Sequence, residues 1–362
     1  MLKRLHVENY KTLENFDWKP AHGVSVLIGS NGSGKTAVGS VLHTLKLFLF
    51  DGIGVQEAFP DATRTRWHPE SFRQVFELEL AAPHGTFEYR LEIGFDSHSR
   101  TPWVAQERVA LSGRPLYDFD GASGRLHASP TSVPIPFSNQ RSYLAIVDER
   151  TASTTLFGFS RHLARVLVAK LSPDRLSAYS PMRIESESLA FDGSNFGGWY
   201  RWFASQQPHR LQAYFDALKG PLPGFVALVS RAVGDRYELR ALFEAGHSTV
   251  EFSIDELSDG QRQLLILYLM LQRLDAGSVV FLDEPDNFLS LREIQPWLAE
   301  LDRVAEQTGA QIMLISHQAE AMDYLSSRSA FVFARRDGRG TTVSELNHAT
   351  MPSEVVLYGA TQ

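Results

Sequence analysis

Residues 29–36 read GSNGSGKT, which is the G-x-x-x-x-G-K-S/T pattern of a phosphate-binding loop. The apolar run at 24–28 predicts a strand before this loop, and apolar residues at three- and four-residue intervals after Lys35 predict an amphipathic helix. Backbone N–H groups of such a loop surround the phosphates of a nucleotide, the lysine adds a positive charge, and the Thr36 hydroxyl can bind Mg²⁺. The sequence therefore predicts a nucleotide site made of Gly29, Ser30, Asn31, Gly32, Ser33, Gly34, Lys35 and Thr36.

A second segment, residues 279–285, reads VVFLDEP and predicts a buried strand that ends in two carboxylates, the Walker B pattern. Asp283, at the end of the strand, is the candidate ligand of Mg²⁺. Glu284 is placed to polarise the attacking water as a general base. Together with the phosphate loop, this segment predicts an enzyme that hydrolyses ATP to ADP and phosphate.

Residues 257–263 read LSDGQRQ and predict the start of a helix, with Ser258 as its N-cap and free N–H groups that can meet an anion. The segment resembles the LSGGQ signature of ABC ATPases. Asp259 stands at a consensus glycine, as is frequent in the RecF-like and OLD-like branch. The resemblance implies contact with the γ-phosphate of ATP bound to a second copy, and hence a homodimer on ATP binding, or a higher oligomer, with two composite sites. The residues that it assigns to this contact are Ser258, Asp259, Gly260 and Gln261.

Three further residues are candidates on shorter patterns. His317 follows an apolar run and resembles the switch histidine that touches the γ-phosphate in this class. Gln74 is a candidate for the Q-loop glutamine that senses Mg²⁺ and γ-phosphate, and Lys11 resembles the family's start near the adenine and phosphates. Residues 286–290 stand where a D-loop would lie, but they lack its usual Leu-His-Pro ending.

Two longer segments extend the resemblance along the chain. Residues 3–16, KRLHVENYKTLENF, resemble the first strand and turn of RecF and OLD ATPases. Residues 189–196, LAFDGSNF, resemble their L-x-x-D-G-S-N-L segment. The fold that this implies is an α/β ABC-type P-loop ATPase head with a mixed sheet, an antiparallel β meander and an inserted helical lobe. The long interval between Lys35 and Ser258 disfavours the compact nucleotide-binding domain of a transporter.

Hydrophobic periodicity gives the organisation of the chain. The alternating runs that predict the meander are 75–80, 86–95 and 104–111. Helical spacing from about 142 to 231, including Leu163, Val166 and Leu167, predicts the lobe, and the lack of a long heptad array excludes an extended coiled-coil arm. The last third predicts a helix at 261–274, a strand at 278–282, a helix at 291–306, a strand at 312–315 and a hairpin of 331–334 with 341–345. We therefore expect two halves of an ATPase head at 1–135 and 248–350, a helical lobe at 136–247 and a tail at 351–362.

The 362 residues are 43% hydrophobic and 21% charged, which is typical of a globular protein. The absence of cysteine excludes disulfides, thiolate metal sites and cysteine nucleophiles. The N-terminus lacks the apolar core of a signal peptide, and the longest apolar run, 264–271, falls far short of the ~18 residues that cross a bilayer. We expect a cytoplasmic protein without a membrane partner.

Partners other than ATP and Mg²⁺ follow from weaker arguments. The net charge of −7 gives no global attraction to nucleic acid, so DNA contact would need a local basic patch. The candidate clusters are Arg161, Arg165, Lys170 and Arg175 in the lobe, and Arg335, Arg336 and Arg339 in the hairpin. The residues after His317 are too few for the Toprim nuclease domain of OLD proteins, so we expect a separately encoded effector protein.

Three functions stay open at this stage. The favoured one is a nucleotide-gated dimeric switch that controls DNA binding or an effector, in DNA maintenance or anti-phage defence by analogy. The second is a scaffold or toxin-sequestering protein that uses ATP structurally, and the third is a transporter ATPase subunit. Glu284 argues against the second, because a structural nucleotide needs no general base, while the altered D-loop at 286–290 argues for it.

Overall fold

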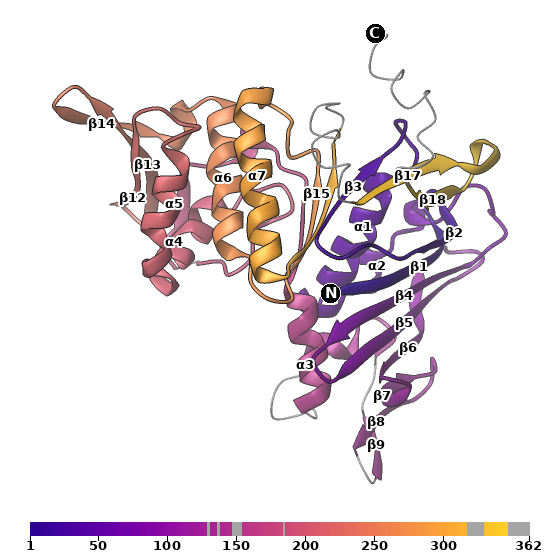
Figure 1. Cartoon of the computed structure of the whole chain (residues 1–362). Helices are drawn as coiled ribbons and strands as arrows, with labels where there is room; N and C mark the ends of the chain where they lie inside the picture. The colour runs from indigo at the N-terminus through magenta and orange to yellow at the C-terminus, as the bar shows by residue number, and fades with distance from the viewer. Residues whose placement is uncertain (129–130, 136–137, 147–153, 184, 317–328, 347–362) are drawn as a thin grey trace.

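The chain folds around three β-sheets with helices packed between and beside them (Figure 1). The structure is a computed structural model, and it describes residues 1–128, 131–135, 138–146, 154–183, 185–316 and 329–346. None of the helices in this described part combines the length and the apolar character that crossing a bilayer requires.

A six-stranded sheet of mostly parallel strands lies at the centre of the molecule (Figure 1). Its order is β10 (Val166–Ala169), β15 (Val279–Asp283), β16 (Gln311–Ile315), β3 (Val24–Ile28), β17 (Ser329–Arg335) and β18 (Thr341–Glu345). Only β18 runs antiparallel to its neighbour. Every residue of β3, β15 and β16 is buried, as expected of parallel strands that are covered on both faces.

The second sheet has eight antiparallel strands and confirms the predicted meander. Its order is β2 (Leu13–Trp18), β1 (Leu2–Tyr10), β4 (Arg73–Ala82), β5 (Gly85–Phe95), β6 (Pro102–Leu111), β7 (Arg114–Phe119), β8 (Gly124–Ala128) and β9 (Thr131–Ile135). From β4 onward each strand pairs with the next along the chain, so the whole stretch is a succession of hairpins.

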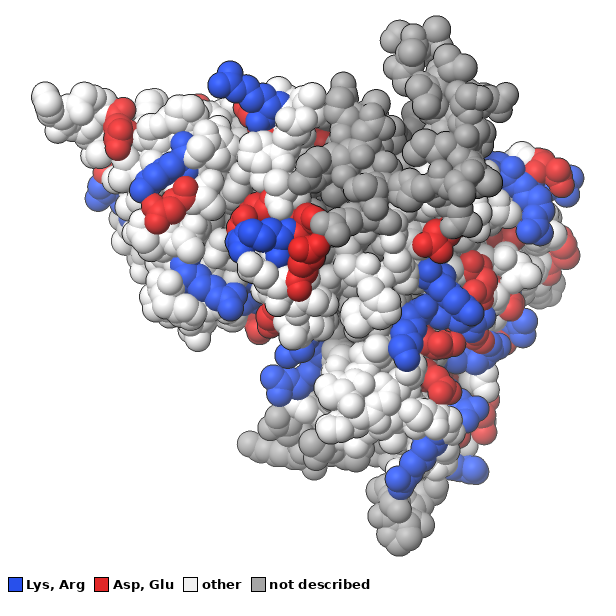
Figure 2. Space-filling view, viewed as in Figure 1, with Lys and Arg blue, Asp and Glu red and all other residues white. Residues whose placement is uncertain are grey.

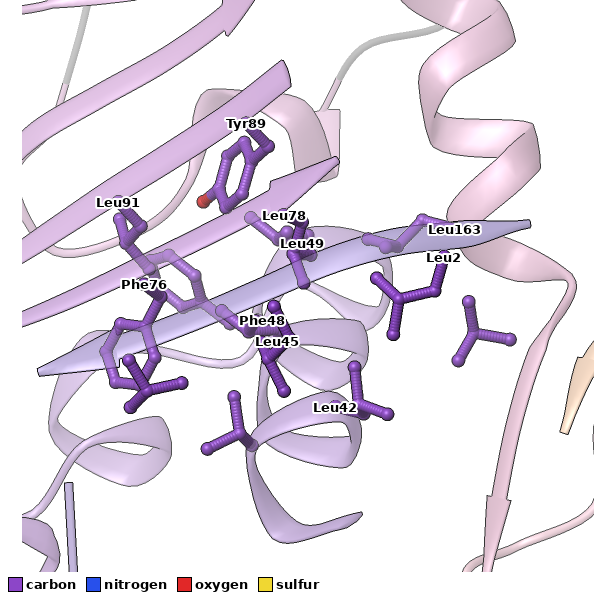
Figure 3. Close-up of a cluster of buried hydrophobic side chains, with 14 of the residues drawn as sticks. Leu2, Leu42, Leu45, Phe48, Leu49, Phe76, Leu78, Tyr89, Leu91 and Leu163 are labelled. Atoms are coloured by element: carbon purple, nitrogen blue, oxygen red, sulfur yellow. The ribbon is translucent and has the colours of Figure 1, made fainter. Parts of the chain in front are cut away.

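Helix α1 (Lys35–Lys46) packs between the two sheets, and a π-helical turn, Leu47–Asp51, extends it. Figure 3 shows the core that this packing makes. The buried side chains drawn there include Leu2, Leu42, Leu45, Phe48, Phe76 and Leu78. The apolar spacing that predicted this helix is therefore the face that fills the space between the sheets. The short α2 (Val55–Ala58) and α3 (Thr154–Ala164) add to the same core.

The other face of the parallel sheet carries a second core, formed with α6 (Asp259–Arg273) and α7 (Leu291–Thr308). These two helices lie side by side in Figure 1. Beyond them lie α4 (Phe196–Gln206), α5 (Leu211–Leu218) and a four-stranded antiparallel sheet. Its strands are β11 (Tyr179–Pro181), β12 (Phe225–Val233), β13 (Arg236–Ala245) and β14 (Ser248–Ser253).

The prediction of a purely helical stretch at 142–231 is wrong in part. Val166 and Leu167 belong to β10, which pairs with β15 and completes the parallel sheet, and β11 and β12 also fall inside the stretch. The reason is that a short, fully apolar strand satisfies helical spacing as well as strand spacing, so that periodicity alone cannot separate the two. The division of the chain into head halves, lobe and tail remains a proposal, and in it β10 belongs structurally with the head.

Gln311, at the start of β16, joins the two large sheets. Its side chain is buried and exchanges two hydrogen bonds with the backbone of Leu2: it accepts from the amide at 2.8 Å and donates to the carbonyl at 3.0 Å. It also donates to the carbonyl of Ala21 at 2.9 Å. One amide side chain therefore satisfies backbone groups of the N-terminal strand and of the segment that leads into β3.

Candidate nucleotide site

The phosphate loop lies at the carboxyl end of β3, where it turns directly into α1. Crevices beyond the carboxyl ends of parallel strands are the usual ligand sites of such sheets. The first residue before the helix, Gly34, is in the left-handed conformation with φ of 106°, and no side chain caps the helix. The first N–H groups of α1 are therefore left to face the loop, as the sequence predicted.

The β17–β18 hairpin closes one side of the loop. A Cβ atom on Gly34 would overlap the side chain of Thr341, and one on Gly29 would overlap the carbonyl of Phe333. Arg335 also donates to the carbonyl of Gly32, with Nε 2.6 Å from the oxygen. The two glycines are thus required by a neighbour that lies about three hundred residues later in the chain, and the sequence analysis did not find this contact.

The side chain of Lys35 folds back onto the phosphate loop that precedes it. Only 5% of the residue is exposed, and Nζ donates to the carbonyls of Gly29 at 2.6 Å and Ser30 at 3.2 Å. Burial lowers the pKa of its ammonium group, while the carboxylates of Asp283 and Glu284 act in the opposite direction. The positive charge predicted for phosphate binding is therefore held at the loop, and it is attracted electrostatically by both Walker B carboxylates.

Asp283 meets the loop from the end of β15. Its side chain is 3% exposed, and Oδ1 is buried with no hydrogen-bond partner among the described residues. Burial raises the pKa of this carboxyl group, and Lys170 and a hydrogen bond from the Thr36 hydroxyl oppose the rise. A buried carboxylate and a hydroxyl side by side are the oxygen donors that Mg²⁺ takes beside nucleotide phosphates. The residues present therefore fit a magnesium ion at Thr36 and Asp283.

Glu284 follows with a constrained backbone. Its φ is 56°, in the left-handed region that non-glycine residues seldom adopt, and its N–H donates to the carbonyl of Ile315 at 2.9 Å. Oε2 accepts a hydrogen bond from Nδ2 of Asn287 at 2.9 Å. Such conformations persist where the surroundings enforce them, frequently at functional sites. The backbone thus turns the Glu284 carboxylate out of the sheet, beside Asp283.

Lys170 is the residue of this site that the sequence analysis missed. It had been assigned to a basic cluster of the lobe, but its Nζ lies 3.4 Å from Oδ2 of Asp283 and 3.4 Å from Oε2 of Glu284. Burial lowers the pKa of this lysine, but the two carboxylates outweigh burial and raise it above its usual value. The sequence analysis missed this contact because it did not predict β10 as a strand. A lysine directly after a strand that pairs with the Walker B strand must lie near Asp283 and Glu284.

Two other basic residues of the predicted lobe cluster are also held by contacts within the chain. Arg165 donates to the carbonyl of Ala276 at 3.0 Å, and Arg175 pairs with Asp192 at 3.2 Å. On the face that Figure 2 shows, basic and acidic side chains are interspersed. These contacts reduce the sequence argument for a DNA-binding patch, and DNA contact stays a prediction.

The signature segment begins α6 with a complete capping box. The Ser258 hydroxyl accepts from the N–H of Gln261 at 3.3 Å, and the Gln261 side chain accepts from the N–H of Ser258 at 3.0 Å, so Ser258 is the predicted N-cap. Asp259 pairs with Arg262 at 2.6 Å. Among the described residues, no hydrogen bond or ion pair joins residues 258–261 to the phosphate loop. In the described part of the chain, the signature segment and the phosphate loop are therefore not joined by polar contacts.

The signature helix contacts the segment that follows Walker B. Gln263 is fully buried and donates from Nε2 to the carbonyl of Pro285 at 3.0 Å. A Cβ atom on Gly260 would lie 2.8 Å from the carbonyl oxygen of Phe288. The start of α6 is thus in direct contact with residues 285–288, at the predicted D-loop position.

Gln74 does not reach the phosphate loop. Its side chain is fully buried at the start of β4 and donates to the carbonyl of Asn9 at 3.1 Å and to Oγ1 of Thr63 at 3.3 Å. Its amide nitrogen is thus used within the chain, and the contact of Gln74 with Mg²⁺ and γ-phosphate stays a prediction. Through these two hydrogen bonds, Gln74 stabilises the turn that contains Lys11.

Lys11 itself lies in that turn, with φ of 50° and its N–H bonded to the carbonyl of Thr63 at 2.7 Å. Its Nζ lies 5.4 Å from the ring centroid of Tyr10, and burial lowers its pKa. The next residue, Thr12, bonds to the Thr341 hydroxyl at 3.0 Å, which is the side chain that abuts Gly34. The turn thus packs near the phosphate loop through Thr12.

The predicted switch histidine, His317, lies outside the described residues. The residue before it, Ser316, is buried and donates from its hydroxyl to Oδ2 of Asp286 at 2.7 Å. Among the described residues, no group of three or more histidine, aspartate or glutamate side chains is placed to hold a metal ion alone. Mg²⁺ at Thr36 and Asp283 would thus need ligands from nucleotide or water.

Comparison with known proteins gives a family model that matches part of the chain and solved structures with a similar fold. Residues 180–323 match the family model described as "AAA domain, putative AbiEii toxin, Type IV TA system", a range that includes the signature and Walker B segments. A structure of an Smc head bound to the C-terminal winged-helix domain of ScpA is 13% identical with a TM-score of 0.60, and covers 98% of this chain and 99% of its own. The Pyrococcus furiosus Smc head with an extended coiled coil, bound to the C-terminal domain of ScpA, is 12% identical with a TM-score of 0.56, and 96% of each chain is covered.

The fold is therefore that of the Smc head domains, and residues 180–323 match an AAA domain model. A comparison with curated protein sequences finds no match for this chain. The mixed and antiparallel sheets of the expected fold class are both present, and the resemblance drawn from the sequence motifs is confirmed at the level of the fold.

Proposed function

We propose that the chain binds ATP with Mg²⁺, hydrolyses it, and acts as a nucleotide-gated dimeric switch. The observation that carries this proposal is the convergence of four groups at the carboxyl ends of β3 and β15: the Lys35 ammonium, the Thr36 hydroxyl and the carboxylates of Asp283 and Glu284. A nucleotide triphosphate with its metal needs these chemical groups in close proximity.

In this mechanism the N–H groups at the start of α1 bind the phosphates and Lys35 neutralises part of their charge. Thr36 and Asp283 would hold Mg²⁺, and the ion would supply positive charge to stabilise the transferred phosphoryl group. Glu284 accepts a hydrogen bond from the attacking water and orients it toward the γ-phosphate. Asn287, bonded to Glu284 in this structure, keeps the carboxylate directed away from the core.

The dimer rests on the exposed start of α6. Ser258 is exposed, and the helix N-terminus behind it carries free N–H groups and the positive end of the helix dipole. Two copies that meet head to tail would present this end to the γ-phosphate held by the partner. The contact from Gln263 to Pro285 would then couple closure of the dimer to the position of Glu284 in the same chain.

We further propose that nucleotide state controls a separately encoded effector, in genome maintenance or anti-phage defence. The support is analogy, since the description of the family model that matches residues 180–323 names a toxin–antitoxin system. The alternative of a scaffold that uses ATP structurally differs in one respect that can be measured, because it needs no hydrolysis.

The test is the mass of the wild-type chain and of Glu284→Gln in solution, with ATP and Mg²⁺, together with phosphate release. We expect Glu284→Gln to bind ATP, to remain dimeric and to release phosphate at least about 100-fold more slowly. Glu300→Gln on the surface of α7 is the matched control and should behave as wild type, since the ion pair of Glu300 among the described residues is with Arg303. A mass that ignores nucleotide in both proteins would exclude the switch and favour the scaffold.

A further inference from the structure

The ammonium group of Lys170 lies beside the carboxylates of the proposed magnesium site. The parallel register of β10 and β15 sets Ala169 opposite Leu282, so the next residue in each strand, Lys170 and Asp283, are neighbours at the sheet edge. The Nζ atom lies at 3.4 Å from both Walker B carboxylates. A single ammonium group therefore bridges the two side chains assigned to metal binding and to water activation.

Burial explains why a cation is needed there. Asp283 is 3% exposed, and one of its oxygens has no hydrogen-bond partner among the described residues. A buried carboxylate without a counter-charge is costly, because it loses its hydration. Lys35 contributes to the compensation but is committed to the carbonyls of Gly29 and Ser30. Lys170 supplies the remaining charge.

We propose that Lys170 is the built-in counter-ion of the nucleotide-free site, and that it competes with Mg²⁺ for the carboxylates of Asp283 and Glu284. This inference rests on the proposed function, which assigns Mg²⁺ to Asp283. Lys170 is a positioning residue, since it acts on the site through these two carboxylates.

The balance of charge gives the proposal its direction. Two carboxylates and two lysines, Lys35 and Lys170, sum to zero in the nucleotide-free site. A divalent cation alone adds two uncompensated positive charges, and it is repelled. The phosphates of ATP bring more negative charge than the metal brings positive charge, so the metal enters together with ATP. The Lys170 side chain is 40% exposed, so it can withdraw into solvent and release Glu284 for water activation.

The experiment measures Mn²⁺, a spectroscopic substitute for Mg²⁺, by electron paramagnetic resonance with the full chain and without any nucleotide. Lys170→Met removes the charge and keeps the length of the side chain, and we expect Mn²⁺ to bind about tenfold more tightly or better than to wild type. Lys170→Arg keeps the charge and should bind Mn²⁺ as weakly as wild type. Arg175→Gln is the matched control, because Arg175 carries the same charge in the same segment but pairs with Asp192.

The added Mn²⁺ affinity should disappear again in the double variant Lys170→Met with Asp283→Asn, which would place the ion at Asp283. Equal Mn²⁺ binding by wild type and Lys170→Met, with circular dichroism showing both folded, would overturn the proposal. If Lys170→Met fails to fold, Lys170→Gln takes its place with the same expectation. No ATP is present in this assay, so a wild-type chain that proves unable to hydrolyse ATP would refute the proposed function and leave the Mn²⁺ result standing.

Discussion

The phosphate loop and the signature segment are both helix starts that contain glycine, but they are completed in different ways. The start of α1 has no side-chain cap and is enclosed by the β17–β18 hairpin and by the Lys35 side chain. The start of α6 closes itself with the reciprocal bonds of Ser258 and Gln261, and Ser258 is exposed. The first is built to surround an anion within one chain. The second is complete without a ligand and offers its end to another molecule.

The strongest test of this contrast is Lys35→Met. Loss of a charged hydrogen bond to phosphate should weaken the binding of a fluorescent ATP analogue about 100-fold. Lys219→Met is the control, because this exposed lysine pairs only with Asp216, and it should bind the analogue as wild type does. A loss smaller than about threefold in Lys35→Met would mean that the enclosed loop is not the primary phosphate site.

The second test compares the two glycines that precede or begin the helices. Gly34→Ala places a side chain at φ of 106° against Thr341, so we expect the free energy of unfolding in urea to fall by about 2 kcal/mol. Gly260 lies inside a regular helix, where its backbone conformation suits alanine, but the new Cβ would lie 2.8 Å from the backbone carbonyl oxygen of Phe288 and 3.5 Å from Leu289. We therefore expect Gly260→Ala to cost about 1 kcal/mol, from the shift that this contact forces and without the backbone strain of Gly34→Ala. Equal losses would show that the hairpin yields to Gly34→Ala and does not enclose the loop rigidly.

The third test separates the two roles of Ser258, as the N-cap of α6 and as a contact to the ATP bound by a second chain. Ser258→Ala removes the cap and should lower the free energy of unfolding by about 1 kcal/mol. ATP binding by the single chain should stay within about twofold, while ATP-dependent dimerisation and phosphate release fall about tenfold, because the second chain loses its contact.

Ser253→Ala is the matched control for that variant. Ser253 forms a capping box with Glu256 at the short turn 254–256 and belongs to none of the nucleotide motifs, so it should lose a similar amount of stability and keep the rate of phosphate release. If both variants release phosphate at the same rate, Ser258 is only a cap.

The smallest effect is expected for Asp259→Gly, which restores the consensus residue of the signature. It removes the pair between Asp259 and Arg262 on the helix surface, worth about 0.5 kcal/mol. Phosphate release should change less than about twofold, since the segment's N–H groups are unaltered. A tenfold change in either direction would assign the aspartate a direct part in the composite site.

Local signals decided which parts of the molecule could be predicted. The phosphate loop, the Walker B strand, the Ser258 cap and the β meander are written in short stretches of sequence, and each is found where the sequence put it. The role of Gln74 stays a prediction, because a strand presents alternate residues to opposite faces and the sequence does not state which face holds the ligand.

The contacts that were missed are those between distant segments. Lys170 was read as part of a basic surface because β10 resembled a helix, and only its pairing with β15 brings the lysine to Asp283. Thr341 likewise reaches Gly34 through the pairing of β17 with β3. Strand pairing across hundreds of residues is set by the whole fold, so a single sequence cannot supply it.

The bonds of Gln311 bear on how the chain folds during its synthesis. Its partner Leu2 lies 309 residues earlier, and β3 has both of its sheet neighbours, β16 and β17, only in the last part of the chain. A ribosome adds about 5–20 residues per second, so the N-terminal strand and the loop that follows β3 wait on the order of tens of seconds for their partners. During that interval the unpaired edges of β3 are open to chaperones, and the nucleotide site can form only after the residues of β15, β16 and β17 have been synthesised.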